Sequence, residues 1–298
     1  MTNMLDKHNR SSIMVSMNKL SNKERAQIIS CLVEGNSIRG TARMTGRSKN
    51  TVVKLLADVG NACLNYQDKH LRHLKCKQVQ VDEIWSFCYA KQRNVPEQFK
   101  DEAGYGDVWT FTSICADTKI VPCWMVGNRD GITAYEFMFN LAGRIDVRFQ
   151  LTTDGWKPYQ EVVEAVFAGD VDYAQLIKTY GKTDTKSPER KYSPPEFVCA
   201  SKRPINGWPL EGKISTSYIE RQNLTMRMSM RRFARLTNAF SKKVENLAHA
   251  VSLHFMYYNF ARIHRSLGVT PAMEAGVSDH VWELEEIAQL IDNYPQAK

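Results

Sequence analysis

Residues 78–87 have the sequence Gln78-Val-Gln-Val-Asp-Glu-Ile-Trp-Ser-Phe87, in which apolar and polar side chains alternate. This alternation is typical of a β-strand with one face in a core. Asp82 lies inside the strand among valine, isoleucine and tryptophan, where a carboxylate without a partner costs stability. The stretch therefore predicts a strand and, within it, an acid that has a specific partner.

Further strands and helices are predicted on the carboxyl side of this strand. They are the strands 108–115 and 120–126, the helix 133–143, the strand 148–153, the helix 157–167 and the strand 173–177. Three consecutive strands favour an antiparallel meander, and the α-β-α-β order that follows is that of a ribonuclease H-like sheet. We therefore expect an α/β fold with a mixed five-stranded sheet and flanking helices.

The stretch 181–212 contains half of the 10 prolines of the chain. This density predicts an irregular insertion with little helix. Beyond it, the strongly basic segment 217–234 and the amphipathic segment 242–262 are predicted to be helices. Residues 78–265 are thus interpreted as one catalytic domain that carries the insertion.

An all-α region is predicted upstream of the strands. Residues 22–35 and 37–45 have helical patterns, and a third helix begins after Ser48, a favoured N-cap residue. Gly46 permits a tight turn before this third helix, as in a helix-turn-helix. An ordinary three-helix bundle is the alternative interpretation.

In a helix-turn-helix, the third helix presents side chains to the major groove of DNA. Lys49, Asn50 and Lys54 lie on the expected outer face of this helix. We interpret residues 1–60 as a DNA-binding domain of this type and the polar residues 61–77 as a helical linker.

Charge is unevenly distributed along the chain, which has a formal net charge of +8. Residues 1–77 and 213–265 carry +9 and +8, whereas residues 78–212 and the tail 266–298 carry −4 and −5. Basic surfaces of this strength attract polyanions, so nucleic acid is the expected class of partner. Two solvated helix faces would explain the same distribution.

Several classes of protein are disfavoured by composition. The apolar runs are far shorter than the ~20 residues of a membrane-spanning helix, and no apolar signal-peptide core begins the chain. The 7 cysteines include no Cys-x-x-Cys pair, which argues against a disulfide framework or a zinc ribbon. We expect a cytoplasmic, nucleoid-associated protein without a membrane partner.

Three acids are candidates for the chemistry. Asp82 is in the first strand, Asp154 follows the fourth strand in Thr152-Thr-Asp-Gly-Trp156, and Glu220 begins the basic helix. The first and fourth strands are neighbours in the expected sheet, and a late helix packs over them, so the three carboxylates could converge. Converging carboxylates favour divalent cations, and two Mg2+ ions suit phosphodiester chemistry.

Two of these acids also have ordinary structural interpretations. Ser217 and Glu220 have the spacing of a helix capping box. Asp154-Gly155 is a common turn pair. Asp82, surrounded by apolar strand residues, has no comparable explanation.

The segment Ser217-Tyr-Ile-Glu-Arg-Gln-Asn-Leu-Thr-Met-Arg227 and the segment from Arg232 to Lys242 resemble the DDE transposases of the insertion-sequence-one family. The resemblance extends from about Gln78 to Arg265, and the Glu-Arg-x-Asn-Leu-x-x-Arg block is its specific part. It implies a ribonuclease H-like domain whose triad of Asp82, Asp154 and Glu220 binds two Mg2+ ions, with Mn2+ able to substitute.

The resemblance also implies partners and reactions. Such transposases bind the terminal inverted repeats of their element, cleave to free a 3′ hydroxyl and join it to target DNA, as homo-oligomers on the DNA. Asn223, Arg227 and Arg231 in and after the basic helix are expected to contact DNA.

The sequence departs from the family in its N-terminal region and in the proline-rich insertion 181–212, and it leaves two other functions open. No cysteine pairing supports the zinc-binding module that often begins family members. The chain could be a transposase-derived DNA-binding regulator, or a ribonuclease H-like DNA nuclease that does not transfer strands. All three acids are present, which favours the transposase over the regulator.

Overall fold

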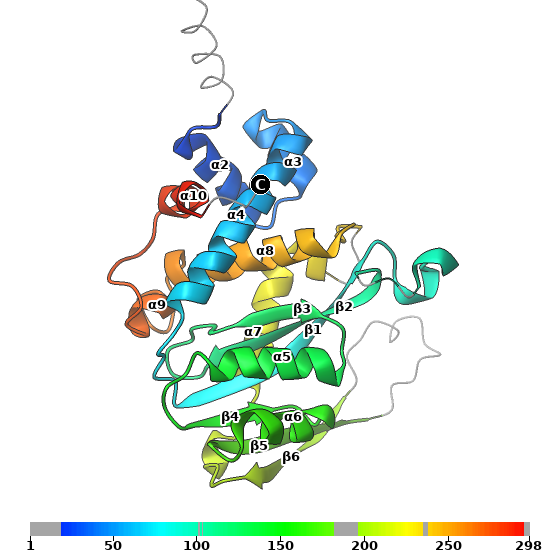
Figure 1. Cartoon of the computed structure of the whole chain (residues 1–298), viewed down its shortest axis with the longest axis vertical. Helices are drawn as coiled ribbons and strands as arrows, with labels where there is room; N and C mark the ends of the chain where they lie inside the picture. Colours follow the sequence, from blue (N-terminus) through cyan, green and yellow to red (C-terminus); the bar gives the residue numbers. More distant parts are fainter. Residues whose placement is uncertain (1–18, 101, 103, 182–195, 235–237, 295–298) are drawn as a thin grey trace, which may run out of the picture.

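The computed structural model describes residues 19–100, 102, 104–181, 196–234 and 238–294. The described residues form a mixed six-stranded sheet in the order β3-β2-β1-β4-β5-β6 (Figure 1). Its strands are β1 (Gln78–Cys88), β2 (Gly106–Cys115), β3 (Trp124–Gly127), β4 (Phe149–Thr153), β5 (Val171–Tyr180) and β6 (Phe197–Asn206). The first three strands pair antiparallel, β4 and β5 continue parallel to β1, and β6 pairs antiparallel with β5.

The sixth strand corrects the expectation of a five-stranded sheet. β6 lies in the proline-rich stretch 181–212, which we had expected to be irregular. Prolines are tolerated in edge strands and at irregularities, and β6 is an edge strand whose pairing with β5 shifts register beside Pro204. Residues 182–195 of the same stretch lie outside the described residues.

Helices cover both faces of the sheet. α5 (Gly131–Ala142) and α6 (Pro158–Phe167) lie in front of it in the view of Figure 1, and α7 (Ser217–Ser229) lies behind it. Side chains of β1 reach the helices on both faces of the sheet: Gln80 bonds to the start of α7, whereas Glu83 bonds to Tyr159 of α6. Fully buried Phe111, Phe137 and Tyr159 belong to the core between the sheet and the front helices.

The N-terminal region contains three helices, α2 (Asn22–Val33), α3 (Ile38–Thr45) and α4 (Lys49–His70). Ser21, Ser37 and Ser48 cap them through their hydroxyls, as their side-chain chemistry favours. α4 is one continuous helix of 22 residues that includes both the predicted third helix and most of the predicted linker 61–77. Residues 1–18 of the expected domain 1–60 lie outside the described residues.

α4 joins this helical region to the rest of the molecule. It packs along α8 (Val244–Met256), and the two helices approach so closely that a Cβ on Gly60 would lie 2.5 Å from Cβ of His249. The hydroxyl of Ser252 donates to the carbonyl of Gly60 across 2.7 Å at the same crossing. Only glycine permits this contact, which fixes α4 against α8.

The chain returns to the N-terminal helices at its end. A π-helical turn (Tyr257–Ala261) follows α8, and then come α9 (Pro271–Glu274) and α10 (Leu284–Asn293). α10 packs against α2 and α4 (Figure 1), and Asp292 pairs with Arg25 at 2.9 Å. The described part of the acidic tail 266–298 is therefore a packed helical segment.

Short 3-10 helices complete the described structure. They are η1 (Gln92–Asn94), η2 (Glu97–Phe99), η3 (Glu211–Lys213) and η4 (Arg231–Phe233). None of the helices in the described part of the chain has both the length and the apolar composition that crossing a membrane requires.

Candidate functional site

A cluster of acids lies where β1 and β4 separate. The two strands run parallel, and Gln80 pairs with Thr152, so Asp82 and Asp154 reach the same level two residues further on. Asp82, Glu83 and Asp154 each place a ligand oxygen within 4.8 Å of the others. We call these three residues the acidic cluster. It brings together two of the three predicted acids and adds one that was not predicted.

Glu83 is the member that sequence reasoning missed. It is buried, and its carboxylate accepts a hydrogen bond from the hydroxyl of Tyr159 and another, at 3.2 Å, from Nε of Arg129. The argument that singled out Asp82, a carboxylate within an apolar strand, applies equally to its neighbour. Its partners could not be found in the same way, because Tyr159 and Arg129 are distant in sequence.

Asp154 combines a turn with a place in the cluster. Its Oδ1 accepts a hydrogen bond from the backbone N–H of Trp156 at 2.9 Å, which is the Asp-Gly turn predicted as the structural alternative. Its Oδ2 lies 3.6 Å from the guanidinium of Arg129. The turn thus fixes one oxygen of Asp154 and leaves the other toward the cluster.

The cluster is electrostatically strained. Burial, followed by the negative charges of Glu83 and Asp154, raises the pKa of Asp82 from 3.8 to about 7, and Glu220 contributes in the same direction. Burial also raises the pKa of Glu83, although Tyr159 and Arg129 oppose the shift. Carboxylates that repel one another in this way attract cations.

Glu220 lies beside the cluster rather than in it. Its Oε1 accepts a hydrogen bond from the hydroxyl of Thr216 at 2.5 Å and pairs with Lys178 of β5. Thr216, not Ser217, is the N-cap residue of α7, so Glu220 bonds to the residue before the predicted capping box. Its charge nevertheless acts on Asp82 through the raised pKa described above.

The start of α7 is attached to β1 next to Asp82. The backbone N–H groups of Tyr218 and Ile219 both donate to Oε1 of Gln80, across 2.8 and 3.1 Å. A glutamine side chain in the strand therefore satisfies amides at the helix N-terminus that have no partner within the helix. This contact places the first turn of α7, with Glu220, over the β1 residues around Asp82.

The side chain of Asn223 lies against Asp82. Its side chain is buried, at 4% exposure, and its Nδ2 donates to Oδ2 of Asp82 across 2.8 Å. Its Oδ1 has no hydrogen-bond partner among the described residues. In this position the amide orients Asp82, whereas a DNA contact was expected from the sequence.

The other expected DNA contacts lie on three elements, α4, α7 and η4. Lys49 and Asn50 are exposed in the first turn of α4, and Lys54 is exposed and pairs with Asp58 at 2.7 Å. Arg227 of α7 is half-buried, and Arg231 is exposed at the start of η4.

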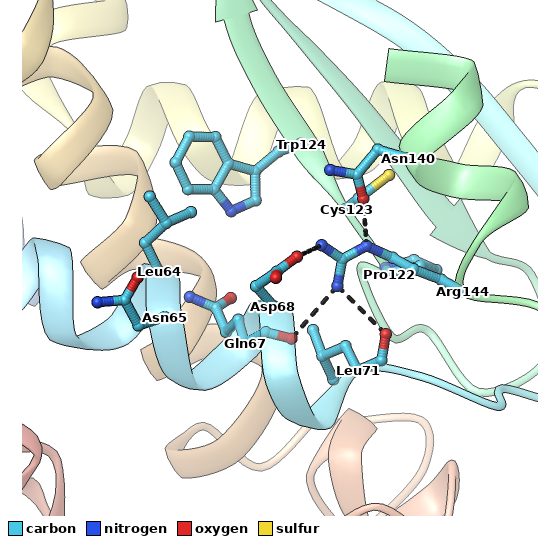
Figure 2. A pocket seen from close by; sticks show the side chains of 10 residues that line it. All are labelled: Leu64, Asn65, Gln67, Asp68, Leu71, Pro122, Cys123, Trp124, Asn140 and Arg144. Carbon is cyan, nitrogen blue, oxygen red and sulfur yellow. Dashed lines mark hydrogen bonds and ion pairs between the residues drawn. The ribbon is translucent and has the colours of Figure 1, made fainter. Parts of the chain in front are cut away.

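A cavity of about 310 Å³ lies away from the acidic cluster, between α4 and the β3–α5 region (Figure 2). Its main polar feature is Arg144, which donates to the carbonyls of Gln67 and Leu71 at 3.2 Å and pairs with Asp68 at 2.7 Å. Figure 2 shows these bonds converging on the guanidinium from α4. The buried arginine explains the cavity as part of the joint between α4 and the sheet domain.

Comparisons with known proteins give limited information. No protein-family model matches the chain, and no curated protein is similar to it. The similar solved structures include a Mos1 transposase paired-end complex with left transposon end, at 10% identity and a TM-score of 0.24, covering 52% of this chain and 59% of that chain. A Mos1 strand transfer complex has 10% identity and a TM-score of 0.23 over 80% of this chain and 76% of that chain. At these scores the likeness carries no argument about fold or function.

Proposed function

We propose that this chain is a DDE-type transposase that cleaves DNA at the terminal inverted repeats of an insertion sequence and transfers the freed ends to target DNA. The observation that carries the proposal is the acidic cluster itself. Asp82 and Asp154 come from different strands, Glu83 joins them, and Glu220 acts on Asp82 from α7. A cluster of converging carboxylates in which Asp82 and Glu83 have raised pKa values is characteristic of a catalytic or metal site.

The architecture supports the same proposal. The order β3-β2-β1-β4-β5, antiparallel in its first part and parallel in its second, matches the ribonuclease H-like arrangement expected from the sequence. β6 adds to this arrangement at its outer edge without interrupting it. The acids lie on the central strand, directly after the end of its parallel neighbour and on the helix that covers them.

The donor chemistry of the cluster fits Mg2+. Carboxylate oxygens are hard ligands of the kind that Mg2+ prefers, and the buried Oδ1 of Asn223 is a further oxygen without a partner among the described residues. Asp82, Asp154 and Glu220 would hold the ions, and Glu83 is a fourth carboxylate within reach. When bound, two such ions would neutralise the acids and favour attack on a phosphodiester.

The remaining side chains prepare the acids for this role. Asn223 holds Oδ2 of Asp82, and the Asp154 turn holds its own Oδ1 through the amide of Trp156. Lys178 balances the charge of Glu220. With these bonds in place, Asp82, Glu83 and Asp154 still each have a ligand oxygen within 4.8 Å of the others.

DNA recognition would fall to the basic elements. We propose that α2, α3 and the first turns of α4 form a helix-turn-helix that binds the terminal repeats, with Lys49, Asn50 and Lys54 toward the major groove. Arg227 and Arg231 would contact phosphates nearer the acids. The enzyme would act in the cytoplasm as a homo-oligomer on the nucleoid DNA.

A strand-transfer reaction tests this function. The full chain would be incubated with Mg2+, a labelled DNA duplex that carries the sequences flanking its own gene, and an unlabelled plasmid target. Label joined covalently to the plasmid is the expected result. Cleavage without joining would identify a nuclease, and repeat-specific binding without cleavage would identify a regulator; either result would contradict the proposal.

A further inference from the structure

We propose that Arg129 is an internal counter-ion of the acidic cluster, held between two tryptophans and displaced when a divalent cation binds. The inference rests on the proposed function in that it takes the cluster as a metal site. It adds a residue of this chain that competes with the metal and thereby sets the metal affinity of the site.

Arg129 connects two members of the cluster. It lies between β3 and α5, directly before Asp130, whose side chain caps α5 by accepting from the amide of Thr133 at 2.8 Å. The guanidinium of Arg129 donates through Nε to Oε2 of Glu83 at 3.2 Å and lies 3.6 Å from Oδ2 of Asp154. One positive charge is thus shared between two carboxylates.

Two indole rings hold the guanidinium in this place. Its central carbon lies 4.9 Å from the ring of Trp109 on β2 and 4.9 Å from the ring of Trp156 after the Asp154 turn. A planar guanidinium stacks on aromatic faces and is attracted by their negative charge density. The rings and the two carboxylates therefore form a slot that suits arginine.

The contacts of Arg129 with the cluster are weak enough for a divalent cation to replace them. A divalent cation would use oxygens of Glu83 or Asp154, which are the groups that Arg129 now neutralises, and two cations cannot share them without strong repulsion. At 3.2 and 3.6 Å these ion pairs are longer than tight charge-assisted bonds, and a third of the side chain is exposed. Arg129 therefore has room to withdraw toward solvent.

Asp82 provides the driving force for the exchange. Within the cluster, Arg129 contacts Glu83 and Asp154, while Asp82 is bonded to the neutral amide of Asn223. A cation that binds Asp82 together with Asp154 would neutralise a carboxylate that Arg129 does not. The arginine thus partly neutralises the metal-free cluster, and a cation that also binds Asp82 would replace it by making a more complete set of contacts.

Metal binding to the full chain without DNA tests the inference. Free Mn2+ would be measured by electron paramagnetic resonance during titration of the wild type and of Arg129→Met, which keeps an unbranched apolar stem between the indoles. Because a competing charge is removed, we expect Arg129→Met to bind Mn2+ about fivefold more tightly or better. The control is Arg148→Met, which removes an arginine paired with Asp172 at 2.7 Å outside the cluster and should leave the affinity unchanged.

A second measurement detects the displacement itself. Titration of the wild type with Mg2+ should change the tryptophan emission, because the guanidinium of Arg129 leaves the faces of Trp109 and Trp156. Arg129→Met has no guanidinium on these rings, so its emission should change much less although it binds Mg2+ more tightly. Arg129→Gln retains a hydrogen-bond donor for Glu83 and should behave like Arg129→Met. Using both variants keeps the test valid if one of them fails to fold.

The outcomes separate this inference from the proposed function. Unchanged or weaker Mn2+ binding by both Arg129 variants, with clear binding by the wild type, would overturn the counter-ion role and leave the metal site intact. Absence of Mn2+ binding to the wild type and to both variants would overturn the metal site and, with it, the proposed function. Tighter binding by both variants, together with an unchanged Arg148→Met, is the result that supports the inference.

Discussion

The side-chain amide of Asn223 donates a hydrogen bond to Oδ2 of Asp82 across 2.8 Å, linking α7 to the central strand. The Asn223 side chain is buried, so this bond fixes the orientation of a carboxylate whose pKa is raised to about 7. An amide can donate to a carboxylate without adding charge. Asn223 therefore orients Asp82 while leaving the negative charge of the cluster available to a cation.

Asn223→Ala tests this orienting role. Loss of the amide leaves Asp82 free to rotate, and loss of a residue that orients a metal ligand commonly costs about 10- to 100-fold in metal affinity or activity. We expect a loss of this size in the rate of Mg2+-dependent cleavage, measured on labelled repeat DNA, with unchanged DNA affinity. The control is Thr225→Ala on the same helix, whose hydroxyl bonds only to the backbone carbonyl of Arg221 in the described structure. A drop in DNA affinity equal to the drop in rate would instead favour the DNA contact expected from the sequence.

The raised pKa of Asp82 predicts a dependence of stability on pH. Because its pKa rises from 3.8 to about 7 on folding, the folded state holds this proton more tightly, and the associated stability is lost as pH rises from about 4 to about 7. Asp82→Asn removes the titration. In metal-free buffer we expect the variant to melt a few degrees above the wild type at pH 8 and at nearly the same temperature at pH 4. Calorimetry at both values checks this, and an equal difference at pH 4 and pH 8 would contradict it.

The exposed first turn of α4 predicts salt-dependent DNA binding. If Lys49 contacts a phosphate, Lys49→Ala should reduce the slope of log affinity against log salt concentration by about one unit, because one counterion fewer is released. Fluorescence anisotropy with terminal-repeat duplexes at several salt concentrations measures this slope. Lys100→Ala is the control, since Lys100 directly follows the short helix η2 and pairs with Glu97 in it, away from α4. Equal slopes for the wild type and Lys49→Ala would exclude the contact.

The packing of α10 on the N-terminal helices predicts two unequal losses of stability. Ile287 is fully buried, so Ile287→Ala should lower the free energy of unfolding by about 2–5 kcal/mol. The side chain of Asp292 is 43% exposed in its pair with Arg25, so Asp292→Ala should lower the free energy of unfolding by less than about 1 kcal/mol. Urea denaturation measures both. Similar small losses would mean that α10 does not hold α2 and α4 in solution.

The sequence was sufficient to predict those features that depend on local pattern. The alternation in 78–87 predicted β1, and the order of elements placed β4 beside it, which is why Asp82 and Asp154 were expected together. Ser48 as an N-cap predicted the start of α4, and the helical patterns of 22–35 and 37–45 predicted α2 and α3 within a few residues. The basic helix was expected to extend over 217–234, whereas α7 ends at Ser229 and η4 follows.

The features that were missed depend on contacts between distant segments. Glu83 has partners on α6 and in the β3–α5 loop, and no local pattern connects these positions. β6 was missed because Pro204 and the surrounding proline-rich stretch argue against a strand unless its edge position is known. The acidic composition of 266–298 concealed α10, whose apolar residues are buried only because α2 and α4 lie opposite.

The most direct test of the central claim is strand transfer by variants of the three predicted acids. Asp82→Asn, Asp154→Asn and Glu220→Gln each keep the shape of the side chain and remove the charge that a metal ligand needs. The assay uses Mg2+, labelled repeat DNA and a plasmid target, with repeat binding measured in parallel, and Asp172→Asn serves as a control outside the cluster. We predict that each of the three variants loses cleavage and joining and retains repeat binding, while Asp172→Asn remains active. Substantial Mg2+-dependent joining by any one of the three would contradict the assignment of that residue and, for Asp82 or Asp154, the claim that the acidic cluster is the active site.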